Sequence, residues 1–139
     1  MMNKESLGAD GIRPILSVEN VSKSIEYYVE KLGFKLGFAW DDKKSKFLDV
    51  GEVGEVSFAQ VGFGSALIML CEKAQGQAGM WIHLDFNSAA KLNNLNERWL
   101  KSGARFIEAP SIRPWGTYEM RIEDLDGHIF RVSSPPAEN

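Results

Sequence analysis

The stretch LSVENVSKSIEYYVEKLGF, residues 16–34, places a helix signal directly after a strand signal. The strand signal is the alternation of side chains over residues 13–18, which is typical of a half-buried strand. Apolar residues then recur at helical spacing from Val21 to Leu32, Asn20 can cap the start of the helix, and Gly33 can end it. The stretch therefore predicts a strand followed directly by a helix.

The second half of the chain repeats this order. Residues 80–86 alternate like the first strand, Ser88 can cap a helix that carries Leu92, Leu95 and Trp99, and Gly103 can end it. Each half therefore predicts a strand, a helix and three further strands. The expected further strands are residues 34–40, 46–63 (interrupted by glycines) and 66–72 in the first half, and 104–109, 117–122 and 128–133 in the second.

Two copies of such a unit indicate one fold. The repeat is too long for a solenoid, and a single copy would leave an open sheet with exposed edges. We expect an α+β fold of two βαβββ modules, about 12–75 and 79–134, whose paired curved mixed sheets form a cleft with the helices on the outer face. These modules make a single domain, 12–134, between a flexible N-terminal tail, 1–11, and a C-terminal tail, 135–139.

The composition limits the classes of function. The 139 residues carry a net charge of −3, whereas nucleic-acid binding needs a clustered excess of Lys and Arg. No apolar run is long enough to span a membrane, and the first residues lack the apolar core of a signal peptide. The single cysteine, Cys71, excludes an intramolecular disulfide and a cysteine-based zinc cluster. We expect a cytoplasmic protein that binds neither nucleic acid nor membrane.

Strand alternation predicts which side chains face the cleft. Trp81, His83 and Asp85 alternate with apolar residues that should cover a helix, so these three should point into the cleft. The same parity turns a second set of residues away from the helices: Arg13 in the first strand, Arg131 in the last, and Glu119, Arg121 and Glu123 in the strand before it.

Several other residues have ordinary structural interpretations. Trp99 lies on the apolar stripe of the second helix and is expected in the core, and Cys71 is expected to be a small buried side chain. His128 follows Gly127 and is expected at the surface. The charged residues 41–44 predict a solvated turn, and the acidic residues 123–126 predict the turn before the last strand.

Two segments resemble a known family. Residues 16–28, continued by KLGF at 31–34, resemble the opening module of the vicinal oxygen chelate superfamily, and DLDGH at 124–128 resembles its Asp-Pro-Asp-Gly ending. This superfamily includes glyoxalase I, extradiol dioxygenases, fosfomycin resistance proteins and bleomycin resistance proteins. The resemblance covers about residues 12–134 and implies paired βαβββ modules. Activity does not follow from it, because one fold hosts many functions.

The resemblance also locates a metal site to be tested. Metal-dependent members hold a divalent ion with His and Glu at four inward strand positions, which here fall on Arg13, on Leu67 or Met69, on Trp81 and on Arg131. Guanidinium, leucine and indole groups offer a metal ion no lone pair, and a thioether is too soft for the ions concerned. We therefore expect no metal, no cofactor and no catalytic residue of the family type.

The nearest branch by resemblance is the bleomycin resistance group, whose members sequester a drug as homodimers without metal ligands. Residues 114–116, Pro-Trp-Gly, followed by Glu119, resemble a segment of that group. The resemblance implies a metal-free homodimer that binds a small molecule, such as a bleomycin-like antibiotic, and confers antibiotic resistance by sequestration. The expected ligand-binding residues are Arg13, Trp40, Trp81, His83, Trp115, Glu119 and Arg131.

The residue types at these positions fit an aromatic or anionic ligand. Indole rings stack on planar groups and contribute about 0.5–1.5 kcal/mol beyond area burial. Arg13 and Arg131 can hold a carboxylate or phosphate, and their positive charge departs from what a cationic drug needs.

Two other functions stay open. An enzyme of the glyoxalase type, a lyase, isomerase or dioxygenase, would need unusual metal ligands such as His83, Glu72 or Asp85. A dimerising or regulatory module would need no ligand at all.

Overall fold

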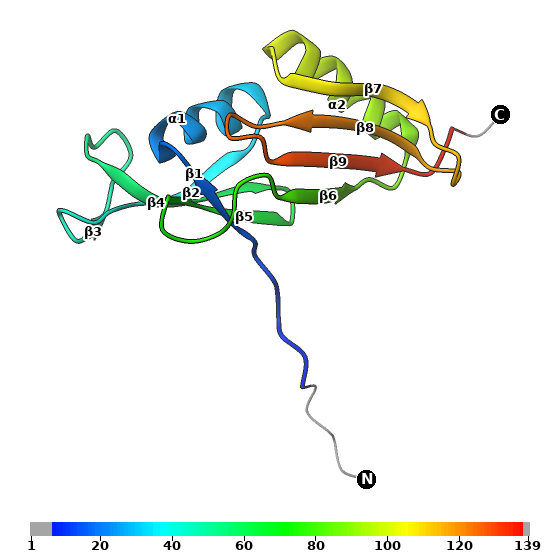
Figure 1. The fold of residues 1–139 in the computed structure, drawn as a ribbon. Coiled ribbons are helices and arrows are strands. Elements are labelled where there is room, and N and C mark those ends of the chain that lie inside the picture. The colour runs from blue at the N-terminus through cyan, green and yellow to red at the C-terminus, as the bar shows by residue number, and fades with distance from the viewer. Residues whose placement is uncertain (1–6, 138–139) are drawn as a thin grey trace.

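Two open sheets, side by side, form the body of the protein (Figure 1). The structure, a computed structural model, describes residues 7–137. The outermost parts of the two expected tails, residues 1–6 and 138–139, lie outside the described range. Within that range the protein is an α+β structure with nine strands in two mixed, uncurled sheets. No helix among residues 7–137 is long and apolar enough to cross a membrane.

The first module builds a five-stranded sheet in the order β1-β5-β4-β2-β3. β1 runs parallel to β5, and the other neighbours are antiparallel. Its elements are β1 (Ile15–Val18), α1 (Val21–Glu26), the π-helical turn η1 (Tyr27–Lys31), β2 (Lys35–Asp41), β3 (Lys46–Phe47), β4 (Val56–Phe63) and β5 (Ala66–Glu72).

The second module builds a four-stranded sheet in the order β6-β9-β8-β7, with β6 parallel to β9. Its elements are β6 (Trp81–Asp85), α2 (Ala89–Ser102), β7 (Arg105–Ile112), β8 (Tyr118–Glu123) and β9 (Ile129–Ser134). The predicted order of strand, helix and three strands is confirmed in this module. In the first module the expected glycine-interrupted run 46–63 is divided into two strands, the short β3 and the longer β4.

The helix limits follow from the predicted capping residues. The side chain of Asn20 accepts a hydrogen bond from the Lys23 N–H, and that of Ser88 accepts one from the Lys91 N–H. Gly103 ends α2 in the left-handed conformation, with φ at 85°, which glycine adopts without steric cost. The first helix differs from the prediction, since it changes at Tyr27 from an α-helix to the wider π-helical turn η1.

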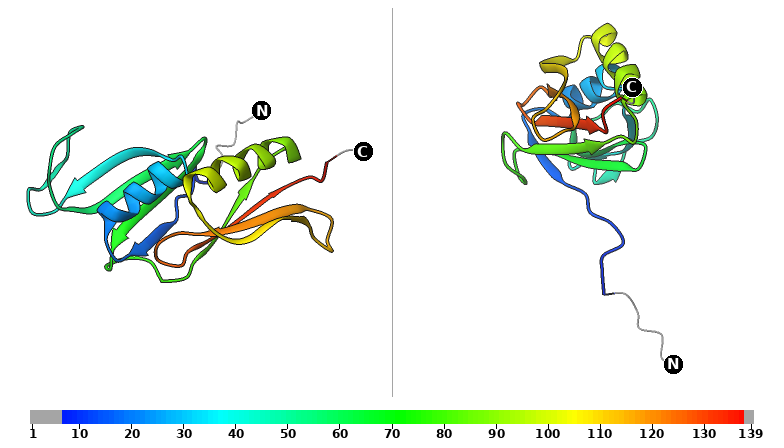
Figure 2. Two further views of the ribbon diagram at one scale, coloured as in Figure 1. Left: turned by 90° about the horizontal axis from the view of Figure 1, so that it is seen from above. Right: turned by 90° about the vertical axis from the view of Figure 1, so that its right-hand side faces the viewer.

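Both helices lie on the same side of the two sheets (Figures 1 and 2). The opposite side, which we call the helix-free face, carries neither helix. The predicted alternation is confirmed in β6, where Leu84 is buried toward α2 while Trp81 and His83 are exposed. It is also confirmed in β9, where Phe130 and Val132 are fully buried.

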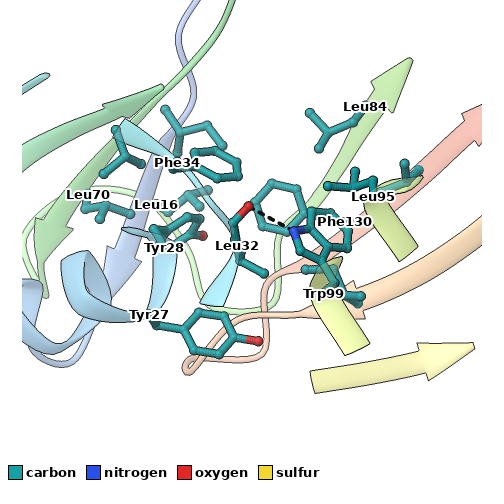
Figure 3. Close-up of a cluster of buried hydrophobic side chains, with 14 of the residues drawn as sticks. Leu16, Tyr27, Tyr28, Leu32, Phe34, Leu70, Leu84, Leu95, Trp99 and Phe130 are labelled. Atoms are coloured by element: carbon teal, nitrogen blue, oxygen red, sulfur yellow. Dashed lines mark hydrogen bonds between the residues drawn. The ribbon is translucent and has the colours of Figure 1, made fainter. Parts of the chain in front are cut away.

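One hydrophobic core under the helices joins the two modules. Phe130 of β9 packs edge-on against Tyr28 and Phe34 of the first module (Figure 3). Trp99 is 1% exposed, as its place on the α2 stripe predicts, and its indole N–H donates to the Leu32 carbonyl at 2.9 Å. Because these contacts cross from one module to the other, the two sheets are held in a fixed arrangement.

His128 is buried where the two modules meet, so the expectation that it lies at the surface was wrong. Its side chain is fully buried, and its Nδ1 accepts a hydrogen bond from the Met80 N–H at 3.0 Å. Its Nε2 lies 2.7 Å from the Ser17 carbonyl oxygen and therefore carries the proton that is donated there. The ring thus binds the start of β6 to β1, a tertiary contact with no local sequence signal.

The acidic turn before β9 behaves as its composition predicts, with one addition. Asp124 accepts hydrogen bonds from the N–H groups of Asp126 and His128, as turn aspartates do. It is also buried and accepts the Tyr28 hydroxyl proton at 2.7 Å. Burial raises the pKa of Asp124 above its usual value, although its hydrogen bonds oppose that shift.

The turn after β2 is solvated only in part. Residues 42–45 are exposed, as expected, but Asp41 is 1% exposed and accepts hydrogen bonds from the N–H groups of Lys44 and Glu55. Asp41 therefore closes the turn and ties it to the loop before β4. Cys71 is buried and free, in line with the expectation of a small core side chain.

Candidate functional site

The helix-free face of the second sheet carries a group of charged, polar and aromatic side chains. Pairing of the strands aligns His83 of β6 with Arg131 of β9 and Arg121 of β8 in one row across the sheet. Glu108 of β7 continues this row, and Glu119 begins the next one. We call the group the charged cluster; its members are His83, Glu108, Arg113, Glu119, Arg121 and Arg131, with Trp81 and Trp115 at its margins.

Glu119 is the buried centre of this cluster. Its carboxylate accepts hydrogen bonds from the Arg131 guanidinium at 2.9–3.2 Å, from the Trp115 indole N–H at 3.2 Å and from the Thr117 hydroxyl at 3.0 Å. Burial by itself would raise the pKa of Glu119, but these hydrogen bonds outweigh it and lower the pKa to about 2. The carboxylate is therefore an anion at neutral pH, with its oxygens already occupied.

Two further arginines share the second carboxylate of the cluster. Arg113 pairs with Glu108, and its Nε lies 3.9 Å from Glu119. Arg121 reaches the same Glu108 at 3.6 Å. Three guanidinium groups are thus interlocked with two carboxylates, which leaves one positive charge in excess within this group.

Trp81 and Trp115 flank the arginines and are open to solvent. Each indole is 56% exposed and has a guanidinium 5.4 Å from its ring centre, Arg121 at Trp81 and Arg131 at Trp115. Trp115 is presented by a tight turn in which the Gly116 N–H donates to the Arg113 carbonyl at 2.9 Å. Gly116 has φ at 98°, which explains why the Pro-Trp-Gly segment needs glycine there. Both rings can stack on a planar ligand.

His83 contacts polar groups that cannot form a nucleophilic triad with it. Its Nε2 lies 2.6 Å from the Ser133 hydroxyl and 3.4 Å from an Asp85 carboxylate oxygen. A triad needs the carboxylate on the other ring nitrogen, where it would orient the base toward the hydroxyl. The arrangement therefore positions His83 as a hydrogen-bonding group at the edge of the cluster.

Of the two remaining candidate residues, Trp40 lies in the other sheet and Arg13 lies just before the first strand of that sheet in the chain. Arg13 precedes β1 and donates to the Gln60 side chain on β4 at 2.6 Å. Trp40 on β2 packs against Phe47 with ring centres 4.8 Å apart, and its N–H donates to Asp42. With Phe38 and Phe58, which stack at 6.1 Å, these two rings make an aromatic surface on the helix-free face of the first sheet.

The structure thus gathers five of the seven candidate residues at one sheet and two at the other. Trp81, His83, Trp115, Glu119 and Arg131 share the charged cluster. The role of all seven in ligand binding stays a prediction. Sequence reasoning did not select Arg113, Arg121 or Glu108, although the alternation of β8 already turned Arg121 to this face.

The residues at the family's metal positions do not fit a metal ion. Arg13 and Arg131 are committed as hydrogen-bond donors to Gln60 and Glu119, and Trp81 offers only its ring. Among residues 7–137, no three His, Cys, Asp or Glu side chains come together in a group that could hold a metal ion. No chemical step through a metal follows from this donor set.

Two hollows lie to the side of the charged cluster, one at its edge and one on the first sheet. One of about 510 Å³ is lined by the turn between β4 and β5 and by residues 83–86, at the end of β6, so it touches His83 and Asp85. Another of about 560 Å³ lies against Trp40, Phe58 and residues 71–75. The charged cluster itself is an open face of the single chain.

Residues 11–132 match the family described as the Glyoxalase/Bleomycin resistance protein/Dioxygenase superfamily. The chain belongs to this superfamily. The resemblance drawn from residues 16–34 and 124–128 is thereby confirmed at the level of the superfamily. No curated protein sequence matches the chain.

Several solved structures share the fold of this chain at low sequence identity. TioX from Micromonospora sp. ML1 has a TM-score of 0.71 at 15% identity, covering 91% of this chain and 100% of TioX. TnmS3, an antibiotic binding protein from Streptomyces sp. CB03234, has a TM-score of 0.66 at 18% identity, covering 94% of this chain and 100% of its own. A glyoxalase/bleomycin resistance protein/dioxygenase from Nocardioides has a TM-score of 0.65 at 16% identity, covering 96% and 92%.

Proposed function

We propose that this protein binds a planar small molecule on its helix-free face, without a metal, and acts by sequestering it. The observation that carries the proposal is the pair of half-exposed indoles, Trp81 and Trp115, at the margins of the charged cluster. A protein surface seldom leaves two large aromatic rings open beside fixed charged groups unless they contact a partner. An antibiotic is a suitable ligand class, because TnmS3, which shares the fold, is an antibiotic binding protein.

A homodimer would complete this site. Binding pockets bury about 70–90% of the surface of a small ligand, which the open face of one chain does not provide. Large apolar side chains remain exposed on this face of both sheets, including Phe47 at 57% and Trp81 at 56%. A second copy laid over the helix-free face would cover these side chains and close a cavity against the charged cluster. Sedimentation of a dimer at micromolar concentration is expected, and a monomer there would contradict this part of the proposal.

The first test is the metal content of protein purified without chelators and then challenged with divalent ions. We expect no tightly held metal, because the side chains at the family positions offer none of the usual ligands. About one Zn, Ni, Fe or Mn ion per chain would contradict the proposal and favour the enzymatic alternative.

The second test is ligand binding followed by tryptophan fluorescence and by melting temperature. A panel of planar antibiotics, with bleomycin included, is expected to give at least one compound that quenches the fluorescence and raises the melting temperature. Trp81→Ala and Trp115→Ala should each weaken that binding about tenfold, the effect of losing one stacking contact of roughly 1.4 kcal/mol. Leu100→Ala, which shortens an exposed side chain on α2, should leave it unchanged. Equal affinities of all four proteins would exclude the helix-free face as the site.

A further inference from the structure

Two arginines stand directly opposite each other on the helix-free face. The register of β8 with β9 pairs Arg121 with Arg131, and the register of β6 with β9 adds His83 on the far side of Arg131. Like charges directly opposite in a sheet destabilise it. A fold that carries such a pair needs negative charge close to both guanidinium groups.

The protein supplies that negative charge only in part. Arg131 turns toward Glu119, which it holds with three hydrogen bonds, whereas Arg121 turns toward Glu108 and reaches it only at 3.6 Å. Glu108 is shared with Arg113. The other carboxylates of this face stand at its margins: Asp85 lies beside His83, and Glu123 lies opposite Arg105 in the strand register. The middle of the cluster is therefore one negative charge short.

Arg121 also keeps a donor without an acceptor. Its Nε is shielded from solvent and has no hydrogen-bond partner among residues 7–137. A buried N–H without an acceptor costs about 1–3 kcal/mol, so an acceptor placed there would be bound favourably. Its guanidinium lies against the half-exposed ring of Trp81, so this donor sits beside an aromatic surface.

We propose that the Arg121–Arg131 pair anchors the carboxylate of a planar aromatic acid whose ring system lies against Trp81 or Trp115. The inference rests on the small-molecule site proposed above and defines the chemistry of its ligand. A carboxylate between the two guanidinium groups supplies the missing negative charge and accepts from the free Arg121 donor. A cationic ligand at the same place meets the uncompensated positive charge.

The experiment compares three compounds of one shape: anthraquinone-2-carboxylate, its methyl ester and 2-(aminomethyl)anthraquinone. Their affinities for the unmodified protein are measured by tryptophan quenching and by calorimetry at one fixed ionic strength, because screening changes charge contributions. We expect the carboxylate to bind about tenfold or more tighter than the ester, and the amine to bind most weakly, since a charge-assisted hydrogen bond contributes about 1.5–3 kcal/mol.

Variants of Arg121 locate the effect. Arg121→Gln should reduce the preference for the carboxylate over the ester to within about threefold, and Arg121→Lys should restore part of it because it restores the charge. Arg98→Gln, on the exposed surface of α2, makes the same change in net charge and should keep the full preference. If Arg121→Gln does not fold, the preference for the carboxylate over the ester is compared between the unmodified protein and Arg121→Lys. This comparison still tests whether Arg121 binds the carboxylate.

The possible failures are distinguishable. Equal binding of the three compounds, lost in Trp81→Ala, would overturn the anionic class and leave the small-molecule site in place. Tighter binding of the amine than of the carboxylate would also overturn the anionic class, and it would favour a cationic drug as the ligand. Binding of none of the three, with no compound of the antibiotic panel bound either, would overturn both proposals.

Discussion

Arg131 donates hydrogen bonds to both carboxylate oxygens of Glu119. The two side chains come from the neighbouring strands β9 and β8, where they occupy diagonal positions. Trp115 and Thr117 donate to the same carboxylate, so the turn that precedes β8 is fixed to the ion pair. Glu119 thereby connects the fold to the candidate site, since it sets the place of one guanidinium and of one indole.

Replacement of Glu119 should be costly. Glu119→Gln keeps the size of the side chain but removes the only carboxylate that Arg131 contacts among the described residues, while Arg113 keeps its pairing with Glu108. We expect a loss of about 2–4 kcal/mol in the free energy of unfolding, somewhat below the about 3–5 kcal/mol seen when one member of a fully buried ion pair is removed, because the Arg131 side chain is 35% exposed. Urea titration measures it, with Glu97→Gln on the exposed surface of α2 as the control, expected within about 0.5 kcal/mol of the original. A loss no larger than that of the control would show that the ion pair contributes little.

The same carboxylate predicts how stability depends on pH. Because its pKa falls to about 2 from the ordinary value of 4.5, the folded state binds its proton less tightly than the unfolded state. Its contribution to the free energy of unfolding is therefore complete above about pH 4.5 and declines as the pH falls toward 2. The difference between the two pKa values corresponds to about 3 kcal/mol. Urea titrations of the original protein and of Glu119→Gln at pH 7, 4.5 and 3 should show a constant gap at the first two values and a smaller gap at the third. A gap that is the same at pH 3 as at pH 7 would contradict the lowered pKa.

The fold was predictable because its signals are local. Caps at Asn20 and Ser88, glycine at Gly103 and the alternation in β6 and β9 depend only on a few neighbouring residues. The same alternation brought Trp81, His83 and Arg131 to one face. These positions follow from the periodicity of strands, which needs no knowledge of the rest of the chain.

The missed residues depend on irregular or distant structure. β7 has register shifts on both sides of Glu108, so Phe106 packs toward the core while Glu108, two residues later, reaches the opposite face. Without a bulge the two would share a face, and no pattern in the sequence marks the bulge. His128 was misplaced for a different reason, because a residue after a turn is buried or exposed according to what packs on it, here β1 and the start of β6.

His128 gives a prediction at that junction. His128→Ala would leave the Met80 N–H and the Ser17 carbonyl without partners and create a cavity. A loss of about 2–4 kcal/mol in the free energy of unfolding is expected, together with faster amide exchange at Met80. The matched control is His83→Ala. The His83 side chain is 44% exposed, so its removal should lower the free energy of unfolding by less than about 1 kcal/mol. Similar losses for the two variants would mean that His128 does not hold the modules together.

Trp99 gives the last prediction, on the packing between modules. Its buried indole fills the space under α2 and donates to the Leu32 carbonyl at the end of η1, so Trp99→Phe removes a hydrogen bond and part of the ring at once. Both effects should lower the free energy of unfolding by about 2–3 kcal/mol in urea titration. Trp81→Phe is the same change at a ring that is 56% exposed, and we expect it to cost less than about 0.5 kcal/mol. An equal loss of stability in Trp99→Phe and Trp81→Phe would show that the hydrogen bond from Trp99 to Leu32 does not hold the two sheets together. The fixed arrangement of the charged cluster against the first module would then need another cause.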